Sequence, residues 1–348
     1  MKTNPGRFFE DFRLGERIRH ATPRTVTAAD ATLYTALYGT RFAVQSSDVF
    51  ARAIGYPHSP LDDWLAFHIV FGKTVPDISL NAVANLGYAD GRFLKPVFPG
   101  TTLAAVSEVI GLKESSNRQT GIVYVRSIGY DETGDAVLSY CRWVLVRKWD
   151  ASAPAPDEPV PDLPKVVDPA QIGMACPPID GSRYDDELAC GPYRWADYQA
   201  GEKIDHLDGM TVEEAEHQLA TRLYQNTAKV HFDQHAAVQS RFGRRLVYGG
   251  HVISLARALS FNGLANAFHV AAINGGRHVS PLFAGTTVFA WSEVLAKVEL
   301  AGRNDVGALR LRTVATKDKP CADFPLKDGT ADDPAVILDL DYWVLMPR

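Results

Sequence analysis

Two groups of residues in the second half of the chain have the types and spacing needed to move protons beside a developing negative charge. Asn226 precedes His231 by five positions, and Gly249 and Gly250 stand directly before an apolar segment with helical periodicity. Imidazole titrates near neutral pH, so His231 can act as a base and as an acid in turn. The free amides of a helix that begins at two glycines can hold an oxyanion, because glycine allows the oxygen to approach closely. The pattern therefore predicts a site for proton transfer with oxyanion stabilisation.

The elements that must position these residues occur twice, because the chain repeats itself at an interval of about 186 positions. Leu37-Tyr38 returns as Leu223-Tyr224, and the Pro-x-Phe-x-Gly-Thr-Thr string at 96–102 returns at 281–287. A repeat of this length indicates a fused duplication rather than a solenoid. Two copies of one unit can be compared directly, and chemistry that only one copy retains marks the working site.

The first copy lacks both groups of residues. Thr40 and Gln45 occupy the positions of the asparagine and the histidine, and Asp62 and Asp63 lie where the second copy has its glycine pair. Two carboxylates at a helix start would cap the helix, but they would repel an oxyanion. The comparison predicts one active site per chain, located in the second copy.

Composition narrows the class of protein. The chain has 348 residues, of which 46% are hydrophobic, enough for two domains that each have a core. A net charge of −5 without a lysine-arginine cluster argues against a nucleic-acid partner. No apolar run reaches the roughly 18 residues of a membrane span, and the N-terminus lacks the apolar region of a signal peptide. The four cysteines show no metal-ligand spacing. We therefore expect a cytoplasmic protein with no membrane partner and no metal.

The same composition divides the chain into an N-terminal repeat at 1–148, a connector at 149–193 and a C-terminal repeat at 194–348. Eight prolines fall between Pro154 and Pro178, with hardly any apolar periodicity. Proline fixes φ and has no amide donor. We therefore expect the connector to be extended and to cross a surface, rather than to form a third core.

Each repeat has the same order of expected elements. A first helical segment is expected at 27–38 and at 211–224, where Thr211 and Glu214 have the spacing of a capping box. A second, apolar helix is expected at 61–72 and at 251–263. Strand-like runs close each repeat, at 102–112, 121–130 and 136–147 in the first and at 287–300, 306–314 and 335–346 in the second. One buried helix with several long antiparallel strands is typical of an α+β protein whose sheet curls around a helix.

This order of elements resembles the hotdog fold, and specifically the MaoC-like dehydratase family in its fused double form. Hydratases of this family carry an aspartate followed five residues later by a histidine, within a Gly-Asp-x-Asn-Pro-x-His-type string. Here Asn226 stands at the aspartate position and His231 at the histidine position. The resemblance covers nearly the whole chain outside the connector. It implies a tandem double hotdog, each repeat an antiparallel sheet wrapped around a long central helix, with a catalytic C-terminal repeat and a degenerate N-terminal repeat that shapes the acyl pocket.

The resemblance also implies an activity, the reversible addition of water across the double bond of a short enoyl-CoA. His231 would remove a proton from the water and pass one to Cα, and Asn226 would orient the water. An amide cannot take up a proton, so either His231 carries the proton transfers alone or a carboxylate such as Asp233 assists. By the family's His-Gly-Met string, Gly250, beside Gly249, would donate its amide to the thioester oxygen.

Length, connector and the Asn-x-x-x-x-His variant most resemble the mesaconyl-CoA (2-methylfumaryl-CoA) hydratases, or β-methylmalyl-CoA dehydratases, of the ethylmalonyl-CoA pathway. Coenzyme A is then part of the substrate, and no separate cofactor is implied. A substrate with a free carboxylate should need a cation near the histidine, for which Lys229, Arg244 and Arg245 are candidates. Arg92 and Arg277 are candidates to contact the phosphates of coenzyme A.

Four bulky residues on the expected central helix of the first repeat, Trp64, Phe67, His68 and Phe71, would shorten the pocket and suit a small acyl group. The same residues are also ordinary core residues. Three alternatives stay open: an R-specific enoyl-CoA hydratase for unbranched chains, a hotdog thioesterase, and a non-catalytic acyl-CoA-binding protein. We also expect a homodimer, because a fused pair of sheets still has outer surface to bury.

Overall fold

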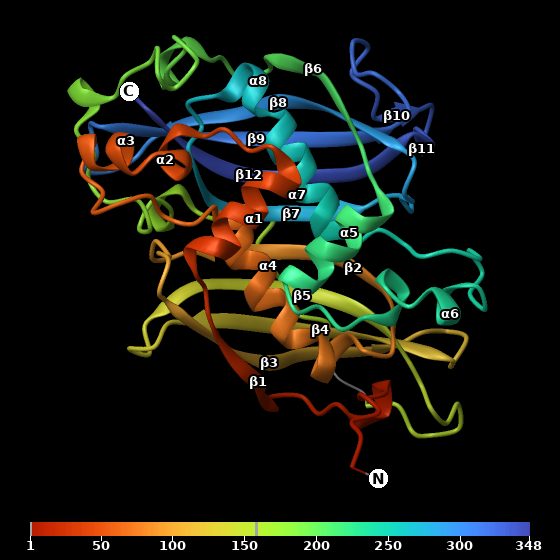
Figure 1. Cartoon of the computed structure of the whole chain (residues 1–348). Helices are drawn as coiled ribbons and strands as arrows, with labels where there is room; N and C mark the ends of the chain where they lie inside the picture. The colour runs from red at the N-terminus through yellow and green to blue at the C-terminus, as the bar shows by residue number, and fades with distance from the viewer. Residues whose placement is uncertain (1, 157–158) are drawn as a thin grey trace.

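The computed structural model describes residues 2–156 and 159–348 and contains one large, wholly antiparallel sheet of ten strands (Figure 1). The first repeat contributes, in spatial order, β1 (Arg17–Thr25), β3 (Thr102–Glu114), β4 (Thr120–Tyr130), β5 (Ala136–Arg147) and β2 (Ala82–Phe93). The second repeat continues the sheet with β7 (His269–His278), β12 (Val336–Pro347), β9 (Val306–Lys317), β8 (Thr287–Glu299) and β6 (Lys203–Thr211). The second order is the first one reversed, as expected for a tandem double hotdog. The fold class predicted from the sequence is confirmed.

The two repeats join through the antiparallel pair β2 and β7. Tyr88 lies opposite Gly276, and Gly91 lies opposite Ile273. Tyr88 and Ile273 are 185 positions apart, as are Gly91 and Gly276. The pairs Tyr88–Gly276 and Gly91–Ile273 therefore occupy equivalent positions, with the two repeats exchanged. A pseudo-twofold axis passes through this junction.

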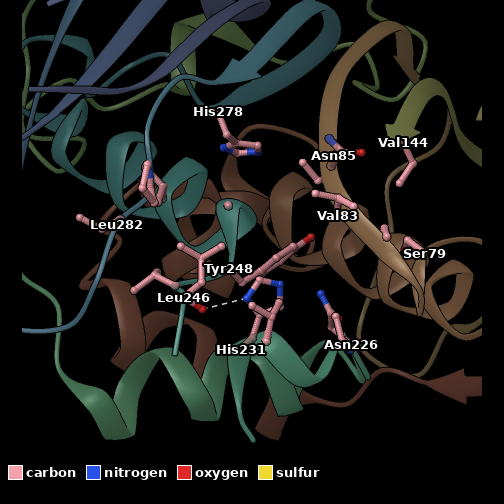
Figure 2. Close-up of a pocket in the computed structure, with 18 of the residues that line it drawn as sticks. Ser79, Val83, Asn85, Val144, Asn226, His231, Leu246, Tyr248, His278 and Leu282 are labelled. Atoms are coloured by element: carbon pink, nitrogen blue, oxygen red, sulfur yellow. Dashed lines mark hydrogen bonds between the residues drawn. The ribbon is translucent and has the colours of Figure 1, made fainter. Parts of the chain in front are cut away.

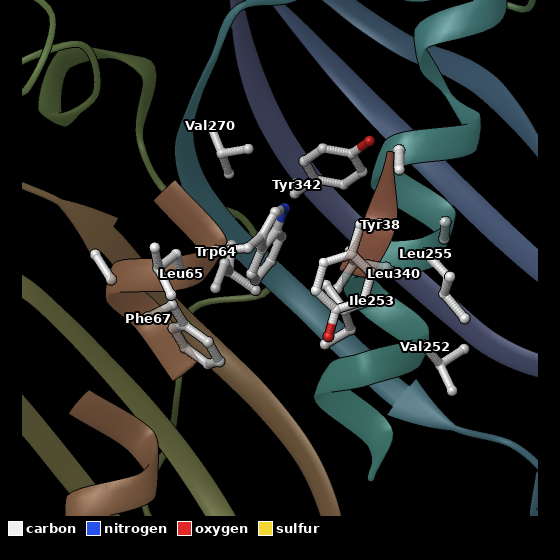
Figure 3. Packing of buried hydrophobic residues seen from close by; sticks show 14 of the residues in the cluster. Tyr38, Trp64, Leu65, Phe67, Val252, Ile253, Leu255, Val270, Leu340 and Tyr342 are labelled. Carbon is white, nitrogen blue, oxygen red and sulfur yellow. The ribbon is translucent and has the colours of Figure 1, made fainter. Parts of the chain in front are cut away.

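The helices gather on one face of the sheet (Figure 1). The two central helices are α4 (Asp63–Thr74) and α7 (Gly249–Leu259), and they lie with α1 (Ala28–Tyr38) and α5 (Glu214–Leu223). Residues from both central helices pack into one buried cluster with residues from the strands (Figure 3). Both central helices are apolar on several sides because strands and neighbouring helices enclose them. No helix in the described part of the chain is long and apolar enough to cross a membrane.

The structure confirms the expected helices and closing strands, and it adds strands that the sequence did not reveal. The entry strands β1 and β6 and the junction strands β2 and β7 were not expected. Both β1 and β6 contain a register shift against their partner strands, which interrupts the alternation of buried and exposed residues. The first six residues of β7 are all buried. A strand buried on both faces has no alternation of polar and apolar residues, so the pattern does not separate it from a buried helix.

The expected capping box at Thr211 and Glu214 is wrong. Thr211 is the last residue of β6, and its hydroxyl lies 2.8 Å from the hydroxyl of Thr287 on β8. The helix α5 begins only at Glu214, after Glu213 as N-cap. In the first repeat the corresponding box does form, because Asp30 accepts a hydrogen bond from the Thr27 amide at 2.8 Å.

The connector is more than an extended crossing. It contains two short 3-10 helices, η3 (Pro169–Gln171) and η4 (Gly181–Arg183). Its buried side chains form a separate apolar cluster with α2 (Ala43–Ser46), α3 (Asp48–Ala53) and strands of the second repeat. The members that the connector contributes are Val167, Ile172, Cys176, Ile179, Tyr184 and Ala189. The connector thus packs against both repeats through isolated apolar residues that lie between prolines and show no helical or strand periodicity.

Candidate active site

A cavity of about 290 Å³ lies between the two repeats, and three of the residues singled out in the second copy line it: Asn226, His231 and Gly249 (Figure 2). The first repeat lines it with the end of α4, the π-helix η2 (Val75–Ser79), β2 and β5, and the second repeat lines it with loops and the start of α7. Most of the wall is apolar, as in small-molecule pockets generally. The polar lining residues are Ser79, Asn85, Tyr88, Arg142, Asn226, His231, Arg241, Tyr248, His278 and Ser280.

His231 presents one ring nitrogen to this cavity. It ends the short 3-10 helix η6 (Lys229–His231), and its Nδ1 lies 2.8 Å from the carbonyl oxygen of Leu246 (Figure 2). A carbonyl can only accept, so Nδ1 carries the proton and Nε2 keeps its lone pair. The surrounding protein lowers the pKa of His231 to about 4, because burial disfavours the imidazolium. At neutral pH His231 is thus a neutral imidazole with a free basic nitrogen.

Asn226 lines the same cavity and has a fixed amide orientation. Its Oδ1 accepts a hydrogen bond from the Ala228 amide at 3.0 Å, which leaves Nδ2 for other partners. Within the described part of the chain Nδ2 makes no hydrogen bond, and it points toward the cavity in Figure 2. The side chain therefore acts as a donor toward the cavity, a role that an ionised aspartate at this position could not perform.

The glycine pair starts α7 as predicted, but the cavity reaches Gly249 and not Gly250. Gly249 is the first residue of the helix and lies in the cavity wall, with Tyr248 as N-cap. Gly250 is buried, and a side chain there would collide with the rings of Tyr248 and His68. The amides of a first helical turn have no partner within the helix. Of the two glycines only Gly249 lines the cavity, one residue earlier than the donor that the sequence led us to expect.

Asp233 does not line the cavity. Its carboxylate is the N-cap of α6 (Gln234–Ala237) and accepts a hydrogen bond from the Ala236 amide at 3.0 Å. This contact accounts for the aspartate without any role in catalysis. The position of Asp233 does not support the expectation that it assists His231.

The three cations expected near the histidine lie elsewhere. Lys229 is exposed, Arg244 donates to the carbonyl of Ala284 at 2.6 Å, and Arg245 forms an ion pair with Glu214. None of the three lines the cavity. Closeness to His231 along the chain did not predict closeness in space, because Lys229 points to solvent and both arginines are held by partners outside the cavity.

Arg92 and Arg277, the candidates for phosphate contacts, are held in ion pairs. Arg92 lies 2.7 Å from Asp90, and Arg277 lies 2.6 Å from Asp332. Neither residue lines the cavity that contains His231. Arg277 instead lines a second cavity on the sheet, and the phosphate contacts expected of the two arginines stay a prediction.

Of the four bulky residues on α4, only Phe71 reaches the cavity. Trp64, Phe67 and His68 belong to a cluster of aromatic rings in the core; Trp64 and Phe67, for example, meet edge to face with ring centroids 5.4 Å apart. The cavity is narrowed by Phe71 from the first repeat and by Tyr248 from the second, whose ring centroids are 5.7 Å apart.

His278, the last residue of β7, also lines the cavity, although no role was predicted for it from the sequence. Its Nε2 lies 3.3 Å from the hydroxyl of Tyr88, and burial, with a smaller effect of His231, lowers its pKa to about 4. A signal was present in the repeat, because the matching position of the first copy, 185 residues earlier, is Phe93. His278 is thus another group of the second copy that the first copy lacks.

Comparison with known proteins adds to this geometry. The sequence profile of a family described as mesaconyl-CoA hydratase matches residues 2–331. A mesaconyl-CoA hydratase of Cereibacter sphaeroides is 61% identical over 349 residues, which cover 100% of both chains. A β-methylmalyl-CoA dehydratase of Chloroflexus aurantiacus is 60% identical over 348 residues, covering 100% of this chain and 99% of the relative. A crystal structure of a MaoC domain protein dehydratase from Chloroflexus aurantiacus superimposes with a TM-score of 0.97 at 60% identity, covering 100% of this chain and 99% of the other.

Proposed function

The chain belongs to the mesaconyl-CoA hydratase family, and from this premise we propose that it catalyses the reversible hydration of mesaconyl-CoA to β-methylmalyl-CoA. The observation that carries the proposal is the meeting of three groups at one cavity. His231 offers a basic nitrogen, Asn226 offers an amide donor, and Gly249 offers a helix-terminal amide. Identity of about 60% along the whole chain supports the same substrate as the relatives.

The geometry suggests how each group acts. A water molecule between the two side chains accepts a hydrogen bond from Asn226 Nδ2 and donates one to His231 Nε2. As the water oxygen bonds to Cβ of the substrate, its proton passes to Nε2, and the electron pair of the double bond moves toward the thioester oxygen. The Gly249 amide at the positive end of α7 stabilises this oxyanion. The imidazolium of His231 then returns the proton to Cα, which completes the addition of water.

The neutral state of His231 favours this sequence of steps. A histidine that was already protonated could not accept the proton of the water, and the lowered pKa keeps the ring neutral at physiological pH. The bond from Nδ1 to Leu246 also fixes the ring, so no reorientation is needed between the two proton transfers.

The test is an absorbance assay of the purified full-length protein with mesaconyl-CoA and crotonyl-CoA in parallel. We expect loss of the enoyl-thioester absorbance with mesaconyl-CoA and a much slower loss with crotonyl-CoA. Preference for crotonyl-CoA would indicate an enoyl-CoA hydratase for unbranched chains instead. A disulfide reagent added to the same assay detects free thiol, and release of coenzyme A without hydration would indicate a thioesterase. Absence of both reactions would contradict the assignment as an enzyme.

A further inference from the structure

One wall of the cavity contains a buried arginine that has no counter-ion among the residues that the structure describes. Arg142 lies on β5 of the first repeat, is 0% exposed, and lines the cavity that holds His231. Among the described residues no aspartate or glutamate forms an ion pair with it. By contrast, Arg126 on the neighbouring strand β4 pairs with Asp90 at 2.9 Å. An uncompensated buried cation is costly, so its presence requires a reason.

All the hydrogen-bond partners of Arg142 are neutral. Its Nη2 donates to the hydroxyls of Thr74 at 2.8 Å and Ser79 at 3.3 Å, and Nη1 lies 3.5 Å from Oδ1 of Asn85. The guanidinium carbon lies 4.3 Å from the ring centroid of Phe71. These contacts hold the group in place but leave its charge unbalanced. The Nε atom is buried and has no partner among the described residues.

Asn85, like Arg142, has a buried nitrogen donor without a partner among the described residues. Its Oδ1 faces Arg142, and its Nδ2 is buried and makes no hydrogen bond within the described part of the chain. Asn85 and Ser79 lie on the side of the cavity that the first repeat forms (Figure 2). This part of the wall therefore offers two unused nitrogen donors and a positive charge, but no negative charge among the described residues. Such a combination fits a carboxylate, which can accept several hydrogen bonds and balance the guanidinium.

The second repeat shows that the fold does not require these two residues. The strand β12 repeats the sequence of β5 200 positions later, with Leu138, Trp143 and Val144 returning as Leu338, Trp343 and Val344. In that alignment Arg142 corresponds to Tyr342. Asn85 corresponds to Val270, 185 positions later, in the same register that relates the junction strands. The first repeat thus has polar donors where its copy has a tyrosine and a valine.

We propose that Arg142, supported by Asn85, binds the free carboxylate of the acyl group and makes the enzyme specific for a dicarboxylic acyl-CoA. The inference rests on the proposed function, because it concerns the substrate of the same site. In mesaconyl-CoA the carbon that water attacks carries the carboxylate, so an anchor on the first repeat would hold that carbon toward the base on the second. Arg241 also lines the cavity but is exposed, and a solvated guanidinium discriminates less between charged and neutral acyl groups.

A binding experiment tests this role without depending on catalysis. Affinities for succinyl-CoA, which has a terminal carboxylate, and butyryl-CoA, which has a methyl group there, are measured by calorimetry with the full chain. We expect the wild type to prefer succinyl-CoA, and Arg142→Met to weaken succinyl-CoA binding about tenfold to 100-fold with little change for butyryl-CoA. Arg147→Gln, at the exposed end of the same strand, is the matched control and should leave both affinities unchanged.

Two further variants cover the case in which Arg142→Met does not fold. Arg142→Lys keeps the charge but loses the planar donor geometry, and Asn85→Val copies the residue of the other repeat. Both should lower the ratio of the two affinities in the direction of Arg142→Met, by a smaller factor. Equal loss of both ligands in all three variants, or an unchanged ratio, would overturn the proposal and leave Arg142 with a structural role.

Turnover separates this inference from the assignment of the reaction. If the wild type hydrates mesaconyl-CoA and Arg142→Met does so at an unchanged kcat/KM, the anchor is wrong while the proposed function stands. If the wild type does not hydrate mesaconyl-CoA but prefers succinyl-CoA through Arg142, the reaction is wrong while the carboxylate anchor stands. With both correct, kcat/KM for mesaconyl-CoA falls at least about 100-fold in Arg142→Met.

Discussion

Tyr38 and Tyr224 hydrogen-bond to each other through their hydroxyl groups at 2.7 Å, and they occupy the same position in the two repeats. His68 and Ser254, also 186 positions apart, form a second contact at 3.1 Å. Their helices α1, α4, α5 and α7 therefore meet around the pseudo-twofold axis that also relates β2 to β7. Equivalent residues of the two copies meet at this axis, whereas the groups that line the cavity, such as His231 and Asn226, have no counterpart of the same type in the first copy.

The tyrosine pair should contribute unequally to stability. The hydroxyl of Tyr38 also lies 2.9 Å from Nδ1 of His251, so Tyr38→Phe removes two buried hydrogen bonds and Tyr224→Phe removes one. We expect Tyr38→Phe to lower the free energy of unfolding by about 2 kcal/mol and Tyr224→Phe by about 1 kcal/mol. Urea denaturation measures both, and the double variant should be less destabilised than the sum of the two. Equal effects of the two single variants would contradict this arrangement.

Replacing His231 should remove most of the activity without unfolding the protein. His231→Gln can keep the bond to the Leu246 carbonyl but has no basic nitrogen, so we expect kcat to fall about 100- to 10,000-fold. The measurement is the mesaconyl-CoA absorbance assay, with circular dichroism as a check on folding. His235→Gln is the matched control, because that histidine is exposed and does not line the cavity. Similar activity in the two variants would rule out His231 as the base.

Much of the fold could be predicted from the sequence because the helices and closing strands have local patterns of polar and apolar residues. The closing strand β4 alternates buried and partly exposed residues along its whole length, and β5 begins and ends at the predicted residues. The junction strand β7 escaped prediction because its buried run has no alternation. The packing of the connector was not predicted for a related reason. Its buried residues are separated by prolines and show no helical or strand periodicity.

The site was only half predictable. His231 and Asn226 could be found because they lie five positions apart in one short segment, as the aspartate and histidine of the MaoC-like hydratases do. Arg142 and Asn85 lie on different strands and have no common spacing in the sequence. In its strand Arg142 stands among apolar residues, and only its burial without a counter-ion distinguishes it. The cations Lys229, Arg244 and Arg245 lie near His231 in the sequence, but distance along the chain does not fix distance in the fold. None of the three lines the cavity.

Asn226→Asp should test whether the amide works as a donor. An aspartate can still accept the hydrogen bond from the Ala228 amide, but once ionised it cannot donate to a water in the cavity. We expect kcat to fall at least about tenfold in Asn226→Asp, although the substitution restores the residue usual in the wider family. Asn226→Ala should lose activity and also about 1 kcal/mol of stability, because the Ala228 amide then lacks its partner. Higher activity in Asn226→Asp would show that an acceptor is needed instead.

Gly249 should not tolerate a side chain. A Cβ atom there would lie 2.4 Å from Cε1 of His278, although the helical backbone itself would accept alanine. We expect Gly249→Ala to displace the ring or the start of α7, and to cost about 1–3 kcal/mol of stability together with most of the activity. His278→Ala removes the obstructing ring, so Gly249→Ala combined with His278→Ala should be more stable than Gly249→Ala alone. Thermal unfolding checks this, and additive losses would contradict the proposed collision.

Acid should destabilise the protein at a pH well above the range in which surface carboxylates titrate. Five enclosed histidines have a pKa lowered mainly by burial, to about 3 for two of them and about 4 for the others: His68, His251, His206, His231 and His278. In the unfolded chain the same groups titrate near 6.5. Between about pH 6.5 and 4 the unfolded state therefore binds more protons, and the free energy of unfolding decreases as the pH falls through this window.

Asp62 opposes this trend, because burial raises its pKa to about 6 and its protonation favours the folded state as the pH falls. One carboxyl group does not offset five imidazoles, so the net effect is destabilisation, by roughly 1–2 kcal/mol for each histidine between pH 7 and pH 5. Urea denaturation at pH 7, 6 and 5 measures the slope. His206 does not line the cavity. His206→Gln should make the dependence of the unfolding free energy on pH shallower, because the variant lacks one of the groups that take up a proton on unfolding. A free energy of unfolding that stays constant over this range would contradict the enclosure of these rings.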